Sequence, residues 1–337
     1  MLEIILIMLS RRFIIISILF IILVGGTVAV LADVTTPMVR THSTVFEVMS
    51  GDSVWNIAHR LSEQQIIRSP LWFVVRALFS GHFSAFKPGV YEITSTSLSD
   101  ISRALSLGPQ EIRITIVPGM TLREIDALFS ERGIIPAGLL QTIMPTLLRS
   151  SCSPCTYATN LEGLLAPDTY QFYRGSNPET VVRTLIEVSE KNLRLATDNK
   201  SITDRDLYEK IIVASLLEKE VQSYTDKQLV AGIIYKRLSL HMRLQIDASV
   251  SYGACLSDMG KCVLTRDSFK VDTPFNTYTR EGLPPNPIAS PSLDSLRAAF
   301  YPQTSLYLYY LSDPLTGTTY FSKTFDEHDT KRGIYLR

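Results

Sequence analysis

The chain has 337 residues, and its 33 acidic and 33 basic side chains balance to a net charge of zero. This length is sufficient for more than one hydrophobic core. The balanced charge argues against a nucleic-acid partner held by phosphate neutralisation, and it favours an uncharged or mixed-charge polymer as a macromolecular ligand.

A long apolar run covers residues 13–32, directly behind Arg11 and Arg12. Its length predicts a membrane-spanning helix. The basic residues on its N-terminal side place residues 1–12 in the cytoplasm and the bulk of the chain outside. The alternative is a cleaved signal peptide, because small residues at the end of the run offer a cleavage site. We predict a single-pass inner-membrane protein with a polar tether over residues 33–43 and with the bulk of the chain in the periplasm.

Two stretches beyond the tether match each other without gaps, residues 46–67 and residues 114–135. Gly51 in the first stretch aligns with Gly119 in the second, and a Ser or Thr follows each glycine two residues later. Each stretch therefore predicts a short strand, a glycine turn and an amphipathic helix that begins at a hydroxyl N-cap.

The first stretch is predicted to belong to a strand–helix–helix–strand module over residues 44–108. A unit of this size and order resembles the LysM glycan-binding module. The alternative is a small α+β spacer that binds no ligand. Residues 109–150 are predicted to form a second strand–helix module or connector, and a polar, turn-rich stretch indicates a domain boundary near residue 150.

Four cysteines occur as two close pairs, Cys152 with Cys155 and Cys255 with Cys262. In an exported protein such pairs form disulfides, whereas in the cytosol the four thiolates could bind a metal. Because the chain is predicted to be exported, we expect a disulfide within each pair.

Residues 151–337 predict a mixed α+β domain, so the chain as a whole is assigned to the α+β class. The alternation of polar and apolar residues over 244–253 predicts an extended segment, which places Gln245 and Asp247 on one face. Helices are expected over 178–197, 204–221, 227–240 and 292–300, and strands over 306–312 and 320–324 with a turn at Gly317.

The most apolar of these helices contains the sequence IIVASLLEKEV at residues 211–221. Glu218 shares a helical stripe with apolar side chains, whereas Glu220 points to nearly the opposite side. Burial against apolar neighbours raises the pKa of a carboxyl, and a general acid needs such a pKa. The alternative is a charged helix end in which Glu218 pairs with a Lys or Arg.

From Leu161 onward, six motifs follow one another in an order that resembles the endolytic murein transglycosylases, which are membrane-anchored YceG-like enzymes. No single motif is specific, but the ordered series is. The motifs are LEGLLAPDTY (161–170), ASLLEKE (214–220), LQIDASVSYG (244–253), FNTY (275–278), GLPPNPI (282–288) and YLYYLSD (307–313), and FSKTFDEH (321–328) follows them.

The resemblance implies a carbon–oxygen lyase that cuts the β-1,4 bond between N-acetylmuramic acid and N-acetylglucosamine within glycan strands. The new ends would be 1,6-anhydro-N-acetylmuramic acid, and the cuts would limit the length of nascent strands. No cofactor and no metal are implied. The first glutamate of the E-K-E triplet, Glu218, would act first as the acid and then as the base.

Four further residues are expected to bind the substrate. Gln245 and Asp247 would align the sugar or support Glu218, unless they only hydrogen-bond to their own loop. Asn276 and Tyr278 would hydrogen-bond to sugars and stack on them, unless the segment is only a turn. Glu162 is expected to fasten local structure rather than to line the cleft.

Two other functions stay open on the sequence alone. A hydrolase could use Asp247 to activate water, and a non-catalytic peptidoglycan-binding scaffold could keep the same motifs. The expected partners are peptidoglycan strands and the membrane, with cell-wall synthases as candidate protein partners and with no nucleic acid.

Overall fold

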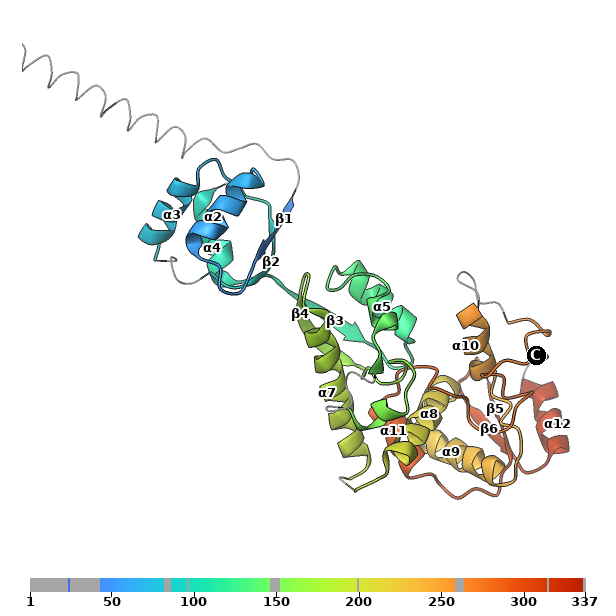
Figure 1. The fold of residues 1–337 in the computed structure, drawn as a ribbon. Helices are drawn as coiled ribbons and strands as arrows, with labels where there is room; N and C mark the ends of the chain where they lie inside the picture. The colour runs from blue at the N-terminus through green and yellow to red at the C-terminus, as the bar shows by residue number, and fades with distance from the viewer. Residues whose placement is uncertain are drawn as a thin grey trace, which may run out of the picture. The chain divides into compact units, whose positions relative to one another are not determined.

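The structure is a computed structural model, and it describes Val24 and residues 43–81, 86–95, 97–145, 152–198, 200–257, 264–313 and 315–335. The chain divides into two compact units, Met1–Glu111 and Ile112–Arg337, each with its own hydrophobic core (Figure 1). Within the described residues, no helix is long and apolar enough to cross a membrane. The predicted span over residues 13–32 lies outside the described residues, apart from Val24.

The first unit places three helices against a two-stranded antiparallel sheet, in which Phe46 lies opposite Tyr91. The predicted strand–helix–helix–strand order is confirmed, and one more helix follows it. The identification of this unit as a LysM module, and its binding of glycan, stay predictions. Its elements are β1 (Thr44–Val48), α2 (Val54–Glu63), α3 (Pro70–Phe79), β2 (Gly89–Ile93) and α4 (Leu98–Leu107).

The second unit packs its helices around one continuous core. This core joins Phe129 to Phe172, whose ring centroids lie 5.7 Å apart, so residues from both sides of the predicted boundary near 150 share it. Its elements are β3 (Glu111–Ile116), α5 (Leu122–Glu131), α6 (Leu139–Thr142), β4 (Asp168–Tyr173), α7 (Pro178–Ala196), α8 (Asp204–Glu220), α9 (Tyr224–Ser239), α10 (Asp247–Ser257), α11 (Leu293–Phe300), β5 (Tyr309–Ser312), β6 (Thr319–Ser322) and α12 (Phe325–Tyr335).

The two matching stretches of sequence adopt the same local structure, β1 to α2 and β3 to α5. Gly51 and Gly119 have φ angles of 86° and 85°, in the left-handed region that favours glycine. The side chains of Ser53 and Thr121 then accept hydrogen bonds from backbone N–H groups in the first turns of α2 and α5. The predicted glycine turns and hydroxyl caps are therefore confirmed.

Helix α8 is the central helix of the second unit, and Figure 1 shows it beside α9 and α11. Every residue from Ile211 to Leu217 is buried. The one polar side chain among them, Ser215, donates to the carbonyl of Ile212 and accepts from the N–H of Ile288 at 3.0 Å. A buried hydroxyl is thus satisfied, and α8 is fastened to the proline-rich GLPPNPI segment.

The same segment explains why a glycine follows Glu162. Gly163 has a φ of 73°, and a Cβ at this position would lie 2.4 Å from the Cβ of Pro287. Both the backbone conformation and the close approach require glycine here. The LEG and GLPPNPI motifs, distant in sequence, are therefore in direct contact.

The extended segment predicted over residues 244–253 is wrong from Asp247 onward, because this acidic residue opens helix α10. An acidic side chain in the first turn suits a helix N-terminus, and this local signal outweighs the alternation. The predicted hairpin is confirmed, since Tyr310 on β5 lies opposite Phe321 on β6. Helix α12 was not predicted.

The disulfide between Cys152 and Cys155 is present, with Cα atoms 5.4 Å apart. This part of the cysteine prediction is confirmed. Cys262 lies outside the described residues, so its pairing with Cys255 stays a prediction.

Candidate active site

The C-terminal end of α8 opens onto a cleft of about 460 Å³ in the second unit. Residues from α8, α9, α10, β5 and α12 form its walls together with the loops at 244–245 and 278. The lining side chains are Glu220, Arg237, Leu244, Gln245, Asp247, Tyr278, Tyr309, Tyr310, Leu311, Ser312, Phe325, His328 and Arg332. Most of them belong to motifs of the ordered series.

Glu220 is one of the residues that line this cleft. Burial raises its pKa to about 7, although hydrogen bonds from Tyr310 and from the backbone of Ala248 act in the opposite direction. The charge of nearby Asp247 raises the pKa further. The hydroxyl of Tyr310 donates to Oε2 of Glu220 at 3.1 Å. A carboxyl with such a pKa holds or releases a proton near neutral pH, as acid and base catalysis require.

Three of the predicted substrate-binding residues, Gln245, Asp247 and Tyr278, line the same cleft. The hydroxyl of Tyr278 donates to Oδ1 of Asp247 at 2.5 Å. The backbone N–H of Gln245 donates to the carbonyl of Thr277 at 3.1 Å, which joins the two loops. Gln245 has a φ of 52°, a conformation that is rare for a residue with a side chain and that concentrates at functional sites.

Glu218 is not among the residues that line this cleft, and it has a different environment. The Nζ of Lys227 lies 3.2 Å from its Oε1, and both side chains are almost fully buried. Its Oε2 accepts from the N–H of Ser292 at 2.8 Å, from the hydroxyl of Ser292 at 2.5 Å and from that of Ser295 at 2.6 Å. Glu218 therefore joins α8 to α9 and to the first turn of α11.

These partners determine the ionisation of Glu218. Burial raises the pKa, but the hydrogen bonds from Ser292 and Ser295 and the charge of Lys227 outweigh it, so the pKa lies below its usual value. The predicted net rise of this pKa is wrong, and Glu218 pairs with a lysine, as the alternative stated. Its catalytic role, which the resemblance implies, stays a prediction.

The reason lies in how deeply α8 is packed. A helical-face argument assumes that one side of a helix is inside and the other is outside. Because α8 is covered on all sides, the side of Glu220 is also interior, and it is the side that borders the cleft. The expectation that Glu220 points away from the interior is therefore wrong.

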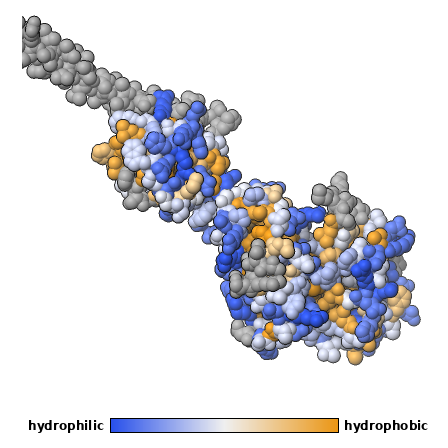
Figure 2. Space-filling view, viewed as in Figure 1, coloured by the Kyte–Doolittle hydropathy of each residue, from blue (hydrophilic) through white to orange (hydrophobic). Residues whose placement is uncertain are grey.

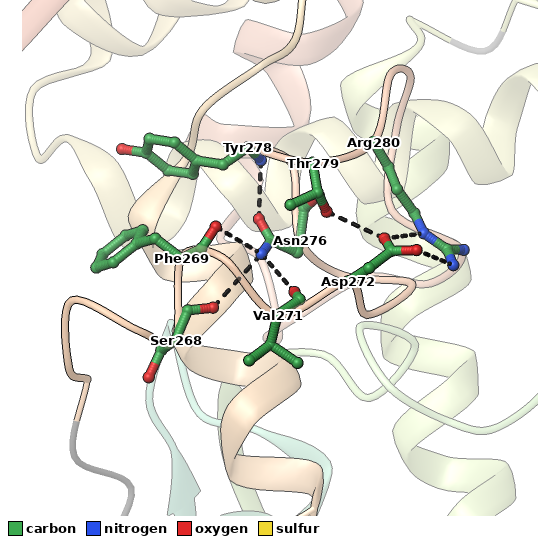
Figure 3. Close-up of polar contacts among 8 residues, drawn as sticks. All are labelled: Ser268, Phe269, Val271, Asp272, Asn276, Tyr278, Thr279 and Arg280. Carbon is green, nitrogen blue, oxygen red and sulfur yellow. Dashed lines mark hydrogen bonds and ion pairs between the residues drawn. The ribbon is translucent and has the colours of Figure 1, made fainter.

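Asn276, the remaining predicted substrate-binding residue, is buried within its own loop (Figure 3). Its Nδ2 donates to the carbonyls of Ser268, Phe269 and Val271, and its Oδ1 accepts from the N–H of Tyr278 at 2.9 Å. The side chain thus uses both ends of its amide to hold the loop. Asn276 therefore stabilises its own turn, as the alternative stated, whereas Tyr278 lines the cleft.

The sequence interpretation did not single out three residues of the cleft, Arg237, Tyr310 and His328. Arg237 donates to the carbonyls of Leu308 and Leu244, at 2.7 Å in each case. His328 stacks on Tyr309 with a centroid distance of 5.4 Å, and burial lowers its pKa, as do the charges of Arg332 and Arg237. Tyr310 and His328 lie within the YLYYLSD and FSKTFDEH motifs, which were the signals that could have identified them.

Glu162 fastens structure, as expected. Its carboxyl accepts from the N–H of Leu122 at 2.9 Å and from the hydroxyl of Tyr252 at 2.7 Å. It thereby caps α5 from a distance and connects this helix to α10. Burial raises its pKa to about 7, although both hydrogen bonds lower it.

The chain matches the YceG-like family over residues 46–333. It is 28% identical to the endolytic murein transglycosylase of Bacillus subtilis over 93% of this chain and 91% of that protein. It is also 28% identical to the endolytic murein transglycosylase of Streptococcus pneumoniae R6, covering 84% of this chain and 56% of that longer protein.

Among solved structures, the chain is similar to a YceG-like protein of Listeria monocytogenes, with a TM-score of 0.56 and 26% sequence identity. The similarity covers 87% of this chain and all of that one. The family match, the relatives and the fold agree with the ordered motifs, so this chain is a member of the YceG-like family.

Proposed function

We propose that the chain is an endolytic murein transglycosylase that cleaves the β-1,4 bond between N-acetylmuramic acid and N-acetylglucosamine within peptidoglycan strands. The names of its relatives support this activity. The observation that carries the proposal is the carboxyl of Glu220, which belongs to the lining of the cleft and has a pKa of about 7. The chain would work from the membrane through the predicted span and would limit the length of nascent strands.

Glu220 supplies the proton in this proposal, whereas the resemblance implies Glu218 for the same role, and separate substitutions of the two glutamates decide between them. A protonated Glu220 donates to the glycosidic oxygen as the bond from C1 of the muramic residue to that oxygen breaks. The resulting carboxylate then takes the proton of the C6 hydroxyl, and O6 closes onto C1. Glu220 ends the cycle protonated, and no water is consumed. The intramolecular attack gains effective molarity from the sugar ring itself.

Neighbouring groups assist in defined ways. Tyr310 holds Oε2 of Glu220, which fixes the orientation of the carboxyl. Asp247 sits close enough to raise the pKa of Glu220, and its negative charge favours the positive charge that develops at C1. Gln245 and Tyr278 line the cleft and supply polar and aromatic surface for the sugars.

Purified glycan strands digested in ¹⁸O-water provide the test. The transglycosylase reaction yields 1,6-anhydro-N-acetylmuramic ends without ¹⁸O, and Glu220→Gln abolishes them while circular dichroism stays unchanged. Reducing muramic ends that carry ¹⁸O would replace the proposal with a hydrolase, in which Asp247 activates water. A folded wild-type chain that binds strands and leaves them intact would replace it with the scaffold.

A further inference from the structure

The first unit exposes an apolar surface on helix α3. Leu71 and Leu78 are each 53% exposed, and Phe79 is 87% exposed. Trp72 and Val75 lie between them in the sequence and are partly exposed. Figure 2 shows orange surface at the edge of this unit where Figure 1 places α3.

These residues share one face of the helix. Leu71, Val75 and Leu78 follow the i, i+4, i+7 spacing of a single stripe, and Phe79 and Trp72 border it. The other face, with Phe73, Val74 and Ala77, is buried in the core of the unit. Helix α3 is therefore apolar on both sides, and the described residues of its own unit bury only one of them.

The stretch of sequence that contains α3 carries charges of one sign. No acidic residue occurs between positions 64 and 91, whereas Arg68 and Arg76 are exposed at and beside the helix. An apolar stripe with a tryptophan and flanking arginines is the pattern of a helix that lies in a bilayer interface, where basic side chains meet anionic headgroups. A protein partner for such a face would instead need acidic groups of its own.

The position of the first unit in the chain also favours a bilayer as the partner of α3. The span predicted from the sequence ends at residue 32, and the first strand begins at Thr44. A connection of this length reaches at most about 40 Å when fully extended. The unit would thus be held close to the bilayer surface, where even a weak affinity of α3 becomes effective.

We propose that the exposed face of α3 lies in the interfacial region of an anionic bilayer, with Leu71, Leu78 and Phe79 inserted and Arg68 and Arg76 at the headgroups. This docking goes beyond the proposed catalysis and does not depend on it. It would fix the first unit on the membrane as a second attachment besides the predicted span.

The two tryptophans of the chain make the test direct, because Trp72 lies on α3 and Trp55 lies on α2. The full chain is reconstituted in bilayers of anionic lipid with brominated acyl chains, which quench tryptophans that enter the apolar region. In Trp55→Phe, the remaining Trp72 is expected to lose most of its emission. In Trp72→Phe, the remaining Trp55 is expected to keep it.

Two variants separate insertion from mere proximity. The double substitution Leu78→Ser with Phe79→Ser alters only exposed side chains and is expected to abolish quenching of Trp72. Arg76→Gln is expected to weaken it in anionic bilayers, whereas Arg103→Gln on α4 is the matched control without effect.

The proposal fails if Trp72 is not quenched, or if the chain does not associate with the bilayer. It also fails if Trp55 and Trp72 are quenched equally, because the unit would then lie on another face. A blue-shifted but unquenched Trp72 would show that protein covers α3 instead of lipid.

Discussion

Glu218 and Glu220 stand two residues apart at the end of α8, and they meet opposite electrostatic environments. Lys227 and two serines hold Glu218 as a carboxylate, whereas burial beside Asp247 favours the protonated form of Glu220. Our proposal assigns a structural role to Glu218 and proton transfer to Glu220, and the catalytic role predicted for Glu218 from the resemblance is the alternative. The two roles can be separated by experiment.

We expect Glu220→Gln to lower kcat by roughly 10²–10⁴-fold with little change in the melting temperature, because the amide cannot donate the catalytic proton. Rates of strand cleavage, together with thermal unfolding, measure both effects. Equal losses of activity in Glu220→Gln and Glu218→Gln would contradict the assignment.

Glu218→Gln is expected to act on stability instead. The buried ammonium of Lys227 would lose its counter-charge, which destabilises the fold by about 3 kcal/mol. Kinetics well below the melting temperature should stay near wild type. The double variant Glu218→Gln with Lys227→Met is the control, and it should recover part of the lost stability because no buried charge remains.

Tyr310→Phe should shift the alkaline limb of the kcat profile to higher pH. The hydroxyl stabilises the ionised form of Glu220, so its removal raises the pKa of that carboxyl above about 7. The activity that is lost as Glu220 deprotonates would then persist to higher pH. A profile that keeps its midpoint while kcat falls would show that Tyr310 has only a packing role.

Asp247→Asn should shift the alkaline limb of the kcat profile in the opposite direction, to lower pH. The charge of Asp247 raises the pKa of Glu220, so the neutral amide lowers it and activity is lost at lower pH. The amide oxygen can still accept from Tyr278, which keeps the loop contact. Shifts of the same sign in Asp247→Asn and Tyr310→Phe would refute this account of the Glu220 pKa.

The sequence predicted those features that local chemistry determines. The glycine turns at Gly51 and Gly119, the caps at Ser53 and Thr121 and the hairpin around Gly317 each depend on a few adjacent residues, and all are present. The family resemblance also identified the distant motifs that contribute to the cleft, but it gave no geometry for them.

The sequence did not predict which glutamate borders the cleft. That depends on tertiary contacts of α8, since Lys227 lies on the next helix and Ser292 lies 74 residues beyond Glu218. The start of α10 at Asp247 was missed because the alternating pattern favours a strand, whereas the acidic residue at the helix N-terminus outweighs that pattern. Residues of the 109–150 segment pack into the core of the second unit, and this too depends on tertiary contacts rather than on local sequence.

Glu162 provides a test of stability against pH. Its pKa rises from 4.5 to about 7 on folding, so between these values the unfolded chain releases a proton that the folded chain keeps. The free energy of unfolding therefore falls as the pH rises through this window, by roughly 1–3 kcal/mol from this residue. Glu162→Gln should be less sensitive to pH than wild type in urea unfolding between pH 4.5 and 7. Parallel curves for the two proteins would contradict the raised pKa.

The unequal burial of α8 and α12 has a dynamic consequence. From Ile211 to Leu217 α8 is buried throughout, so its amide hydrogens should exchange only when the whole unit opens. Helix α12, on the other wall of the cleft, has no buried residue and should exchange through local opening. Glu220 would then stay fixed while the wall that carries His328 and Arg332 moves, so under our proposal a long strand could enter or leave sideways without disturbing this carboxyl.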